Sequence, residues 1–141
     1  MDQMGPGRVF SDVSMRDLGL IRRFVLESSI TGCGDRQIVD ELVLAVNEAV
    51  VNILQHAYNN EPGKIEVIVA CGAGVIRVVL LDDGPLFDPT TVPNPDITLP
   101  LAERPFGGMG VYFMREFCDE LRYRRDAGGR NELTLLKRFG P

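Results

Sequence analysis

Three short groups of residues have the types and spacing to do chemistry together, and the first comprises Glu48, Asn52 and His56. A spacing of four residues places all three on one side of a helix. An asparagine can hold Mg²⁺ through its carbonyl oxygen, and a carboxylate beside it can orient or deprotonate a nucleophile. The same spacing also fits a solvated polar stripe, and His56 alone suits the C-terminal end of a helix. The spacing by itself favours the polar stripe.

The second group follows an apolar run at residues 75–81 and contains Asp82 and Gly84. A carboxylate at the end of a buried strand can form the floor of a cleft, where it accepts well from an exocyclic amine such as that of adenine. Gly84 allows the backbone to pass close to a flat ring. An ordinary acidic turn has the same composition, so this group is not specific by itself.

The third group lies directly before a helical pattern and is centred on Gly108, Met109 and Gly110. Glycines at a helix N-terminus expose backbone N–H groups, and the helix dipole favours anions there, so a triphosphate fits. No Gly-Lys-Ser/Thr follows, which excludes a Walker A loop. A flexible turn before a helix is the alternative interpretation.

The elements that must position these groups follow from hydrophobic periodicity and from turn signals. Helical spacing predicts one helix that begins at Ser14 and a second that begins at Asp35 and runs to about Tyr58. Further elements are predicted at 9–13 (at most a short strand), 64–70 and 75–81 (strands), 111–118 (helix), and 121–125 and 132–139 (strands). This order predicts an α+β fold, a two-layer sandwich with helices on one face of a mixed, mostly antiparallel sheet. The irregular segment between Asp82 and Gly110 has a length that is typical of functional lids or of disorder.

Length and composition limit the function classes. The 141 residues fit one domain spanning residues 1–141, with 45% hydrophobic and 25% charged residues. The formal net charge of −5 disfavours nucleic acid as a partner, because an acidic surface repels phosphates. No apolar run is long enough to span a membrane, and three scattered cysteines fit neither a disulfide framework nor a zinc site. A cytoplasmic location is therefore expected.

In this order and at this spacing, the three groups resemble the motifs of one known family. The motifs are an N-box (Glu48-x-x-x-Asn52-x-x-x-His56-Ala57-Tyr58), a first glycine box (Asp82-x-Gly84) and a second glycine box (Gly108-x-Gly110). The family is the Bergerat-fold or GHKL ATPases, which include gyrase, MutL, the ninety-kilodalton heat-shock chaperone and histidine kinases. The stretches at 107–115, 119–123 and 131–137 resemble its anti-sigma-factor serine/threonine kinase branch, the RsbW and SpoIIAB type. The resemblance covers residues 14–138.

The resemblance implies a role for each matched residue in binding ATP. Asn52 is similar to the residue that holds Mg²⁺ against the phosphates, and Asp82 is similar to the one that binds the adenine amine. Gly84 lets adenine approach. The nucleotide-binding residues expected at the phosphates are those of the second glycine box, Gly108, Met109 and Gly110.

Glu48 resembles the general base of the family. In the kinase branch this carboxylate would take the proton of a substrate serine or threonine hydroxyl. Residues 90–106 would form the ATP lid. Because phosphoryl transfer needs mostly positioning and charge neutralisation, one carboxylate, one Mg²⁺ and a helix N-terminus can suffice.

The chain departs from the family pattern at a few positions. Leu86 stands where the first glycine box usually has a second glycine. No lysine matches the phosphate-binding lysine of gyrase-like members, and Arg104 in the lid is a candidate for that contact. Asn131 and Glu132 stand near a Gly-Thr pair that lies beside adenine in many members, which leaves open whether Thr134 takes the place of that threonine.

The leading interpretation is a protein serine/threonine kinase of the anti-sigma type, whose substrate is a small STAS-domain antagonist, an anti-anti-sigma protein. A sigma factor is a second candidate partner. Members of the branch commonly dimerise, so a homodimer is considered: Leu18, Ile21 and Phe24 could form its face, although the core is the favoured place for them.

Two alternatives remain at this point. The same motifs would serve a nucleotide-dependent regulatory binding module with little or no kinase activity, although Glu48 mildly disfavours it, because a pure binder needs no base. The catalytic domain of a histidine kinase is less favoured, because no helix pair with a phospho-accepting histidine precedes the motifs and His56 lies inside the N-box.

Overall fold

The computed structural model describes residues 5–93, 98–100 and 109–139, apart from the side chain of Met109. Its elements, in chain order, are β1 (Gly7–Val13), η1 (Met15–Asp17), α1 (Leu18–Cys33), α2 (Arg36–Asn52), η2 (Ile53–Ala57), β2 (Gly63–Gly72), β3 (Val75–Asp82), η3 (Pro89–Thr91), α3 (Met109–Phe117), β4 (Glu120–Arg125) and β5 (Asn131–Arg138). The strands form one five-stranded sheet in the order β1-β2-β3-β5-β4. All of these neighbouring strands pair antiparallel, so the predicted α+β fold is confirmed, with a sheet that is antiparallel rather than mixed.

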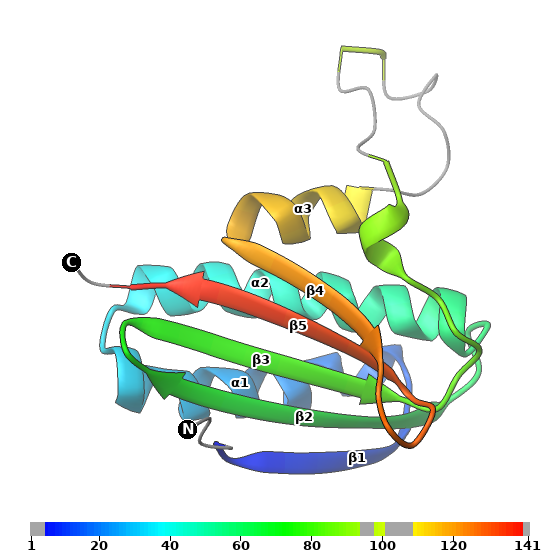
Figure 1. Cartoon of the computed structure of the whole chain (residues 1–141), viewed down its shortest axis with the longest axis horizontal. Coiled ribbons are helices and arrows are strands. Elements are labelled where there is room, and N and C mark those ends of the chain that lie inside the picture. Colours follow the sequence, from blue (N-terminus) through cyan, green and yellow to red (C-terminus); the bar gives the residue numbers. More distant parts are fainter. Residues whose placement is uncertain (1–4, 94–97, 101–108, 140–141) are drawn as a thin grey trace.

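Helices α1 and α2 lie side by side against one face of the sheet (Figure 1). Alternate residues of the strands point toward them, as Ile65 and Val67 on β2 and Val78 and Leu80 on β3 do, and these side chains are fully buried. The sheet thus buries one apolar face under the helices, which is the core of the fold.

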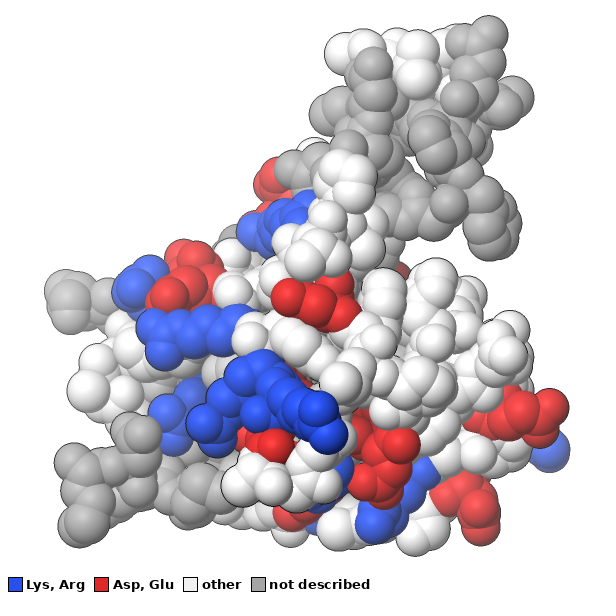
Figure 2. All heavy atoms as spheres, turned by 45° about the vertical axis from the view of Figure 1, so that its right-hand side comes forward, with Lys and Arg blue, Asp and Glu red and all other residues white. Residues whose placement is uncertain are grey.

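The other face of the sheet carries none of the helices that the structure describes. Basic and acidic side chains are intermingled on the surface (Figure 2), and a hollow of about 870 Å³ on this face is lined partly by Arg77, Arg122 and Arg130 together with Glu66 and Glu132. Among the described residues predicted to bind nucleotide, neither Asn52, Asp82 and Gly84 nor Gly110 lines this hollow.

Helix α1 ends and α2 begins over a short junction that the sequence explains. Gly34 has a φ of 75°, and its N–H bonds to the carbonyl of Ile30, which is the common glycine ending of a helix. Asp35 then caps α2, because its Oδ1 accepts from the N–H groups of Gln37 at 3.1 Å and Ile38 at 3.3 Å. The predicted cap at Asp35 is confirmed.

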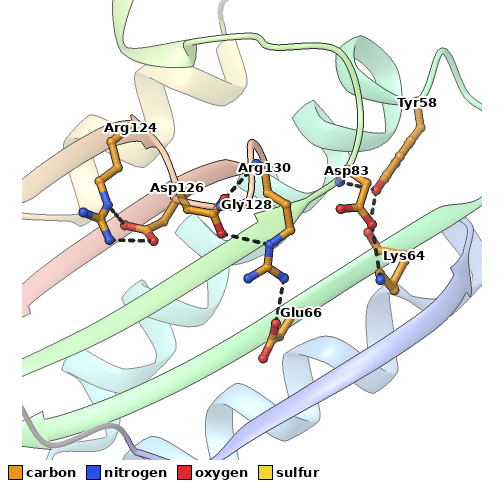
Figure 3. A network of polar contacts seen from close by, with 9 residues as sticks. Tyr58, Lys64, Glu66, Asp83, Arg124, Asp126, Gly128 and Arg130 are labelled. Carbon is orange, nitrogen blue, oxygen red and sulfur yellow. Dashed lines mark hydrogen bonds and ion pairs between the residues drawn. The ribbon is translucent and has the colours of Figure 1, made fainter.

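Helix α2 is α-helical only to Asn52 and continues as a π-helical turn, η2. The N–H of Tyr58 bonds to the carbonyl of Ile53, five residues earlier, at 3.0 Å. The hydroxyl of Tyr58 then donates to the carbonyl of Lys64 at 2.6 Å and accepts from the N–H of Asp83 at 2.8 Å (Figure 3). One side chain therefore ties the end of this helix to the start of β2 and the end of β3.

The two hairpins have the turn chemistry that their residues allow. Ala73 and Gly74 join β2 to β3 with φ values of 54° and 75°, as a tight two-residue hairpin turn requires. Between β4 and β5, Asp126 accepts from the N–H of Arg130 at 2.8 Å, and the Arg130 guanidinium reaches Glu66 on β2 at 2.9 Å (Figure 3). The hairpin of β4 and β5 is therefore tied to β2, the neighbour of β3 on its other side.

The apolar residues considered for a dimer face belong to the core and its edge. Ile21 is buried, and Leu18 and Phe24 pack against the core cluster. Among the described residues, no helix is both long and apolar enough to cross a membrane.

Candidate functional site

Glu48 and Asn52 lie one helical turn apart on α2, and both side chains are half-buried. Helix α3 begins beside Glu48: a β-carbon placed on Gly110 would lie 3.4 Å from Oε2 of Glu48 and 3.9 Å from its Cβ. The structure therefore brings the predicted general base against the first turn of α3. Amide groups of a helix N-terminus attract phosphate oxygens, so this junction has the chemistry that a triphosphate needs.

Asp82 ends β3 and is 3% exposed. Its Oδ1 accepts from the N–H of Gly84 at 3.0 Å and from Nδ2 of Asn131 at 2.9 Å. Burial raises the pKa of the Asp82 carboxyl, and the two hydrogen bonds oppose that rise in part because they favour the charged form. Such a carboxylate is a strong acceptor for one further donor.

Gly84 lies where the first glycine box meets the end of the N-box. A β-carbon there would come within 2.6 Å of the carbonyl oxygen of Ala57 and 2.7 Å of its Cβ. The absence of a side chain at Gly84 thus lets this loop pack directly on η2. Sequence reasoning explained this glycine by the approach of a ring, and the structure adds a contact within the protein itself.

A small hollow lies between these elements, at the end of the site where adenine is predicted to bind. It is lined by Asn52, Ile53, Ala57, Asp82, Phe87, Pro89, Tyr123, Asn131 and Leu133, and its volume is about 10 Å³, room for about one water molecule. The donor and acceptor groups around it fit a nucleobase in their chemistry. The hollow is smaller than a purine.

One of the residues that line the hollow, Phe87, stacks on a second aromatic ring. His56 stacks on Phe87, with ring centroids 4.9 Å apart and an interplanar angle of 25°. His56 lies in the π-turn after Asn52, is exposed and contacts the loop after β3. The predicted polar stripe therefore places Glu48 beside α3, Asn52 at the small hollow and His56 beside the loop.

Sequence reasoning did not find the role of Asn131. This residue pairs with Asp82 in the register between β3 and β5, and it is 3% exposed. Thr134 lines the hollow on the open face of the sheet, so it does not stand beside Asp82. The signal for Asn131 was the strand alternation, because Asn131, Leu133 and Leu135 share the helix-facing side.

The beginning of the predicted lid is described, and most of the rest is not. Nη2 of Arg115 on α3 donates to the carbonyls of Thr90 at 3.0 Å and Val92 at 2.6 Å, which ties η3 to α3. Arg104 and Gly108 lie outside the described residues, as do 94–97 and the remainder of 101–108. For Met109 and Gly110 the structure gives a place in the first turn of α3.

Comparison with known proteins adds to this geometry. A family model described as a histidine kinase-like ATPase domain matches residues 13–137. The chain belongs to this family. Within the histidine kinase-like ATPase family, similar curated proteins include serine-protein kinase RsbW of Bacillus thuringiensis (strain Al Hakam), Bacillus cereus (strain AH820) and Bacillus anthracis (strain CDC 684 / NRRL 3495).

Each of these relatives is 27% identical over 94 residues, which is 64% of this chain and 59% of the relative. The match therefore spans about three fifths of the length of these curated proteins. The resemblance to the GHKL family and to its anti-sigma kinase branch is confirmed. The predicted roles of individual site residues stay predictions.

Proposed function

We propose that the chain binds ATP together with Mg²⁺ and transfers a phosphoryl group to a serine or threonine of a partner protein. The observations that carry the proposal are the contact of Glu48 with the first turn of α3 and the small hollow that Asn52 and the buried Asp82 line at the end of α2. Similarity to serine-protein kinases named RsbW supports the choice of a hydroxyl acceptor.

Each side chain has a distinct task in this proposal. The Asn52 amide oxygen would hold Mg²⁺, which supplies neutralisation of phosphate charge when bound. Asp82 would accept from the exocyclic amine of the base, and the amide groups at Gly108, Met109 and Gly110 would face phosphate oxygens.

Glu48 would accept the proton of the acceptor hydroxyl as that oxygen attacks the γ-phosphorus of ATP. The bond from that phosphorus to the bridging oxygen would break, and ADP would leave. Its place beside Gly110 puts a carboxylate next to the helix terminus where phosphate charge would be held. The chain contributes one base, one metal ligand and a set of fixed dipoles, which suffices for phosphoryl transfer because that reaction depends chiefly on positioning.

The proposed substrate is a small STAS-domain anti-anti-sigma protein, and a sigma factor is a second proposed partner. Both follow from the anti-sigma kinase branch. A regulatory module that binds nucleotide without transfer would use the same residues except Glu48.

The first experiment is a calorimetric titration of ATP with Mg²⁺. Wild type should bind, whereas Asn52→Ala and Asp82→Asn should lose about tenfold or more in affinity, the loss expected for one charge-assisted contact. Asn47→Ala is the matched control, because Asn47 lies on the side of α2 that faces α1 and accepts from Arg22 at 2.7 Å. A folded wild type without affinity for adenine nucleotides overturns the proposal.

Transfer is tested next, with a purified STAS-domain protein and detection of phosphoserine or phosphothreonine. Glu48→Gln should keep ATP binding and lose transfer by about a hundredfold or more, the range for a general base. Equal transfer by wild type and Glu48→Gln would contradict the role of Glu48. ATP binding without transfer in wild type, to any of the STAS-domain proteins tested, would favour the binding module.

A further inference from the structure

Asn131, the first residue of β5, is a buried side chain that the proposed chemistry does not yet use. All of its hydrogen-bonding capacity is engaged. Nδ2 donates to Oδ1 of Asp82 at 2.9 Å, to the carbonyl of Pro85 at 3.0 Å and to the carbonyl of Gly84 at 3.3 Å, while Oδ1 accepts from the N–H of Phe87 at 3.1 Å and from the hydroxyl of Tyr123. One amide thereby joins three strands to the loop after β3.

The partners leave the amide only one orientation. The N–H of Phe87 can only donate, and the carbonyl of Pro85 can only accept. The carboxylate of Asp82 also only accepts when it is ionised. A reversed amide would place its NH₂ group against the N–H of Phe87 and its oxygen against the oxygens of Asp82 and Pro85. Asn131 therefore has a fixed direction, set by groups that are themselves fixed in strands and in the loop.

This fixed amide determines how Asp82 presents its two oxygens. Oδ1 receives both the Asn131 amide and the N–H of Gly84, whereas no hydrogen bond to Oδ2 is recorded among the described residues. Rotation about the last bond of an aspartate is soft, so two donors on one oxygen are what hold the plane of the carboxylate. The second oxygen is thereby held ready for a donor from the hollow.

Building on the proposed function, we propose that Asn131 is a positioning residue for base selection, which holds Asp82 so that Oδ2 meets an exocyclic amine. A 6-aminopurine presents a donor there and is favoured. A 6-oxopurine presents an acceptor to the same lone pairs and is disfavoured, because two acceptors face each other in a buried place.

An amide does this better than a hydroxyl could. A threonine or serine has one proton to donate, whereas the asparagine amide has two protons and an acceptor oxygen. Asn131 can therefore orient Asp82 and hold the Gly84–Phe87 loop at the same time. The neighbouring Arg130, bonded to Asp126 and to Glu66, fixes the hairpin from which Asn131 extends.

The test compares the dissociation constants of ATP, GTP and purine riboside triphosphate, which lacks the 6-amino group. Wild type should prefer ATP to purine riboside triphosphate by about tenfold or more, the value of a charge-assisted hydrogen bond. Asn131→Ala should raise the dissociation constant of ATP by a similar factor and change that of purine riboside triphosphate by less than about threefold. The preference for the 6-amino group should therefore collapse.

Two further variants keep the result decisive. Tyr123→Phe removes one donor to Asn131 and keeps the amide, so it should reduce the same preference in part. Thr134→Val changes the same strand on its other face and should leave the preference at the wild-type value. Folding of every variant is checked by its circular dichroism and thermal midpoint.

The outcomes separate this inference from the proposed function. A wild type that binds none of the nucleotides defeats the proposed function. A wild type that selects ATP, with an Asn131→Ala variant that is equally selective or weakens all nucleotides alike, defeats the inference alone. If Asn131→Ala does not fold, an unchanged preference in Tyr123→Phe defeats it.

Discussion

The imidazole of His56 lies stacked on the ring of Phe87, with centroids 4.9 Å apart. The first residue belongs to the π-turn after α2 and the second to the loop after β3, so the pair joins this turn to the loop that lines the small hollow. That hollow has a volume of about 10 Å³, which is less than a purine needs, so we expect Phe87 to move, and the stack to open, when a purine enters.

Removal of the Phe87 ring should speed nucleotide entry. We expect Phe87→Ala to raise the association rate constant of a fluorescent ATP analogue about twofold to tenfold, since a stacked aromatic pair contributes ~0.5–1.5 kcal/mol. Stopped-flow fluorescence measures this rate. Leu86→Ala, which truncates the exposed neighbouring side chain, should leave it unchanged. A slower association in Phe87→Ala would show that the ring helps to bind the base.

A side chain at Gly84 should destabilise the junction between the two boxes. In Gly84→Ala the new β-carbon would lie 2.6 Å from the backbone oxygen of Ala57, so the loop or η2 must shift. We expect the free energy of unfolding in urea to fall by about 1–3 kcal/mol, the usual range for overpacking. Gly72→Ala, with nothing within 4 Å of its β-carbon, is the control and should change it by less than about 0.5 kcal/mol. Equal effects would mean that the close approach is relieved without strain.

Asp82→Asn should make the chain more stable at neutral pH while it weakens ATP binding. Burial raises the pKa of this carboxyl, so its favourable contribution to folding is complete below the unfolded pKa of about 3.9 and is lost as pH rises through the higher folded pKa. Above that pKa the buried charge opposes folding. Asparagine removes the charge and keeps an acceptor for Gly84 and Asn131.

The measurement is the thermal midpoint of wild type and Asp82→Asn at about pH 8, 6 and 5. The gain in the variant should be largest at the highest pH and should shrink as the pH falls toward the raised pKa. Asp40→Asn, on the exposed side of α2, serves as the control. A variant that is less stable than wild type at about pH 8 would contradict the prediction.

Lys137 should stabilise the end of α3 more than an ordinary surface lysine stabilises its surroundings. Its Nζ donates to the carbonyl of Phe117 at 2.7 Å and to Glu41 at 2.9 Å, and the residue is 8% exposed. Lys137→Met should lower the free energy of unfolding by about 1–3 kcal/mol, because it leaves that carbonyl without its donor.

The control for Lys137 is Lys64→Met. Lys64 forms an exposed ion pair with Asp83 at 3.3 Å, and such pairs contribute about 0–1 kcal/mol. Urea unfolding of both variants makes the comparison. Similar losses would mean that Lys137 acts only as a surface charge.

Most elements could be predicted from the sequence because their signals are local. Asp35 caps α2 through its own neighbouring N–H groups, and Ala73-Gly74 supplies the positive φ values of a two-residue hairpin turn. Alternation of apolar residues located β2 and β3 to within two residues at each end. Each of these signals depends on a few consecutive residues, and no tertiary contact overrides them.

The parts of the site that the sequence left open depend on contacts between distant segments. Asn131 acts on Asp82 because the register of β5 on β3 places them opposite each other, and no local pattern specifies that register. The contact of Gly84 with Ala57 likewise depends on how the loop meets η2. The order of the motifs could therefore identify the family, while the hydrogen bond between Asn131 and Asp82 required the strand pairing.

The π-turn between Asn52 and Tyr58 has a consequence for the comparison of homologues. A π-turn accommodates one more residue than the corresponding α-helical turn. A related chain with a single deletion there could wind as a regular helix, and its tyrosine could still reach the start of the next strand. Glu48 and Asn52 precede the turn and would not move. We therefore expect one-residue length variation at this place among relatives, and alignments that force a constant distance from Glu48 to the histidine would pair non-equivalent residues.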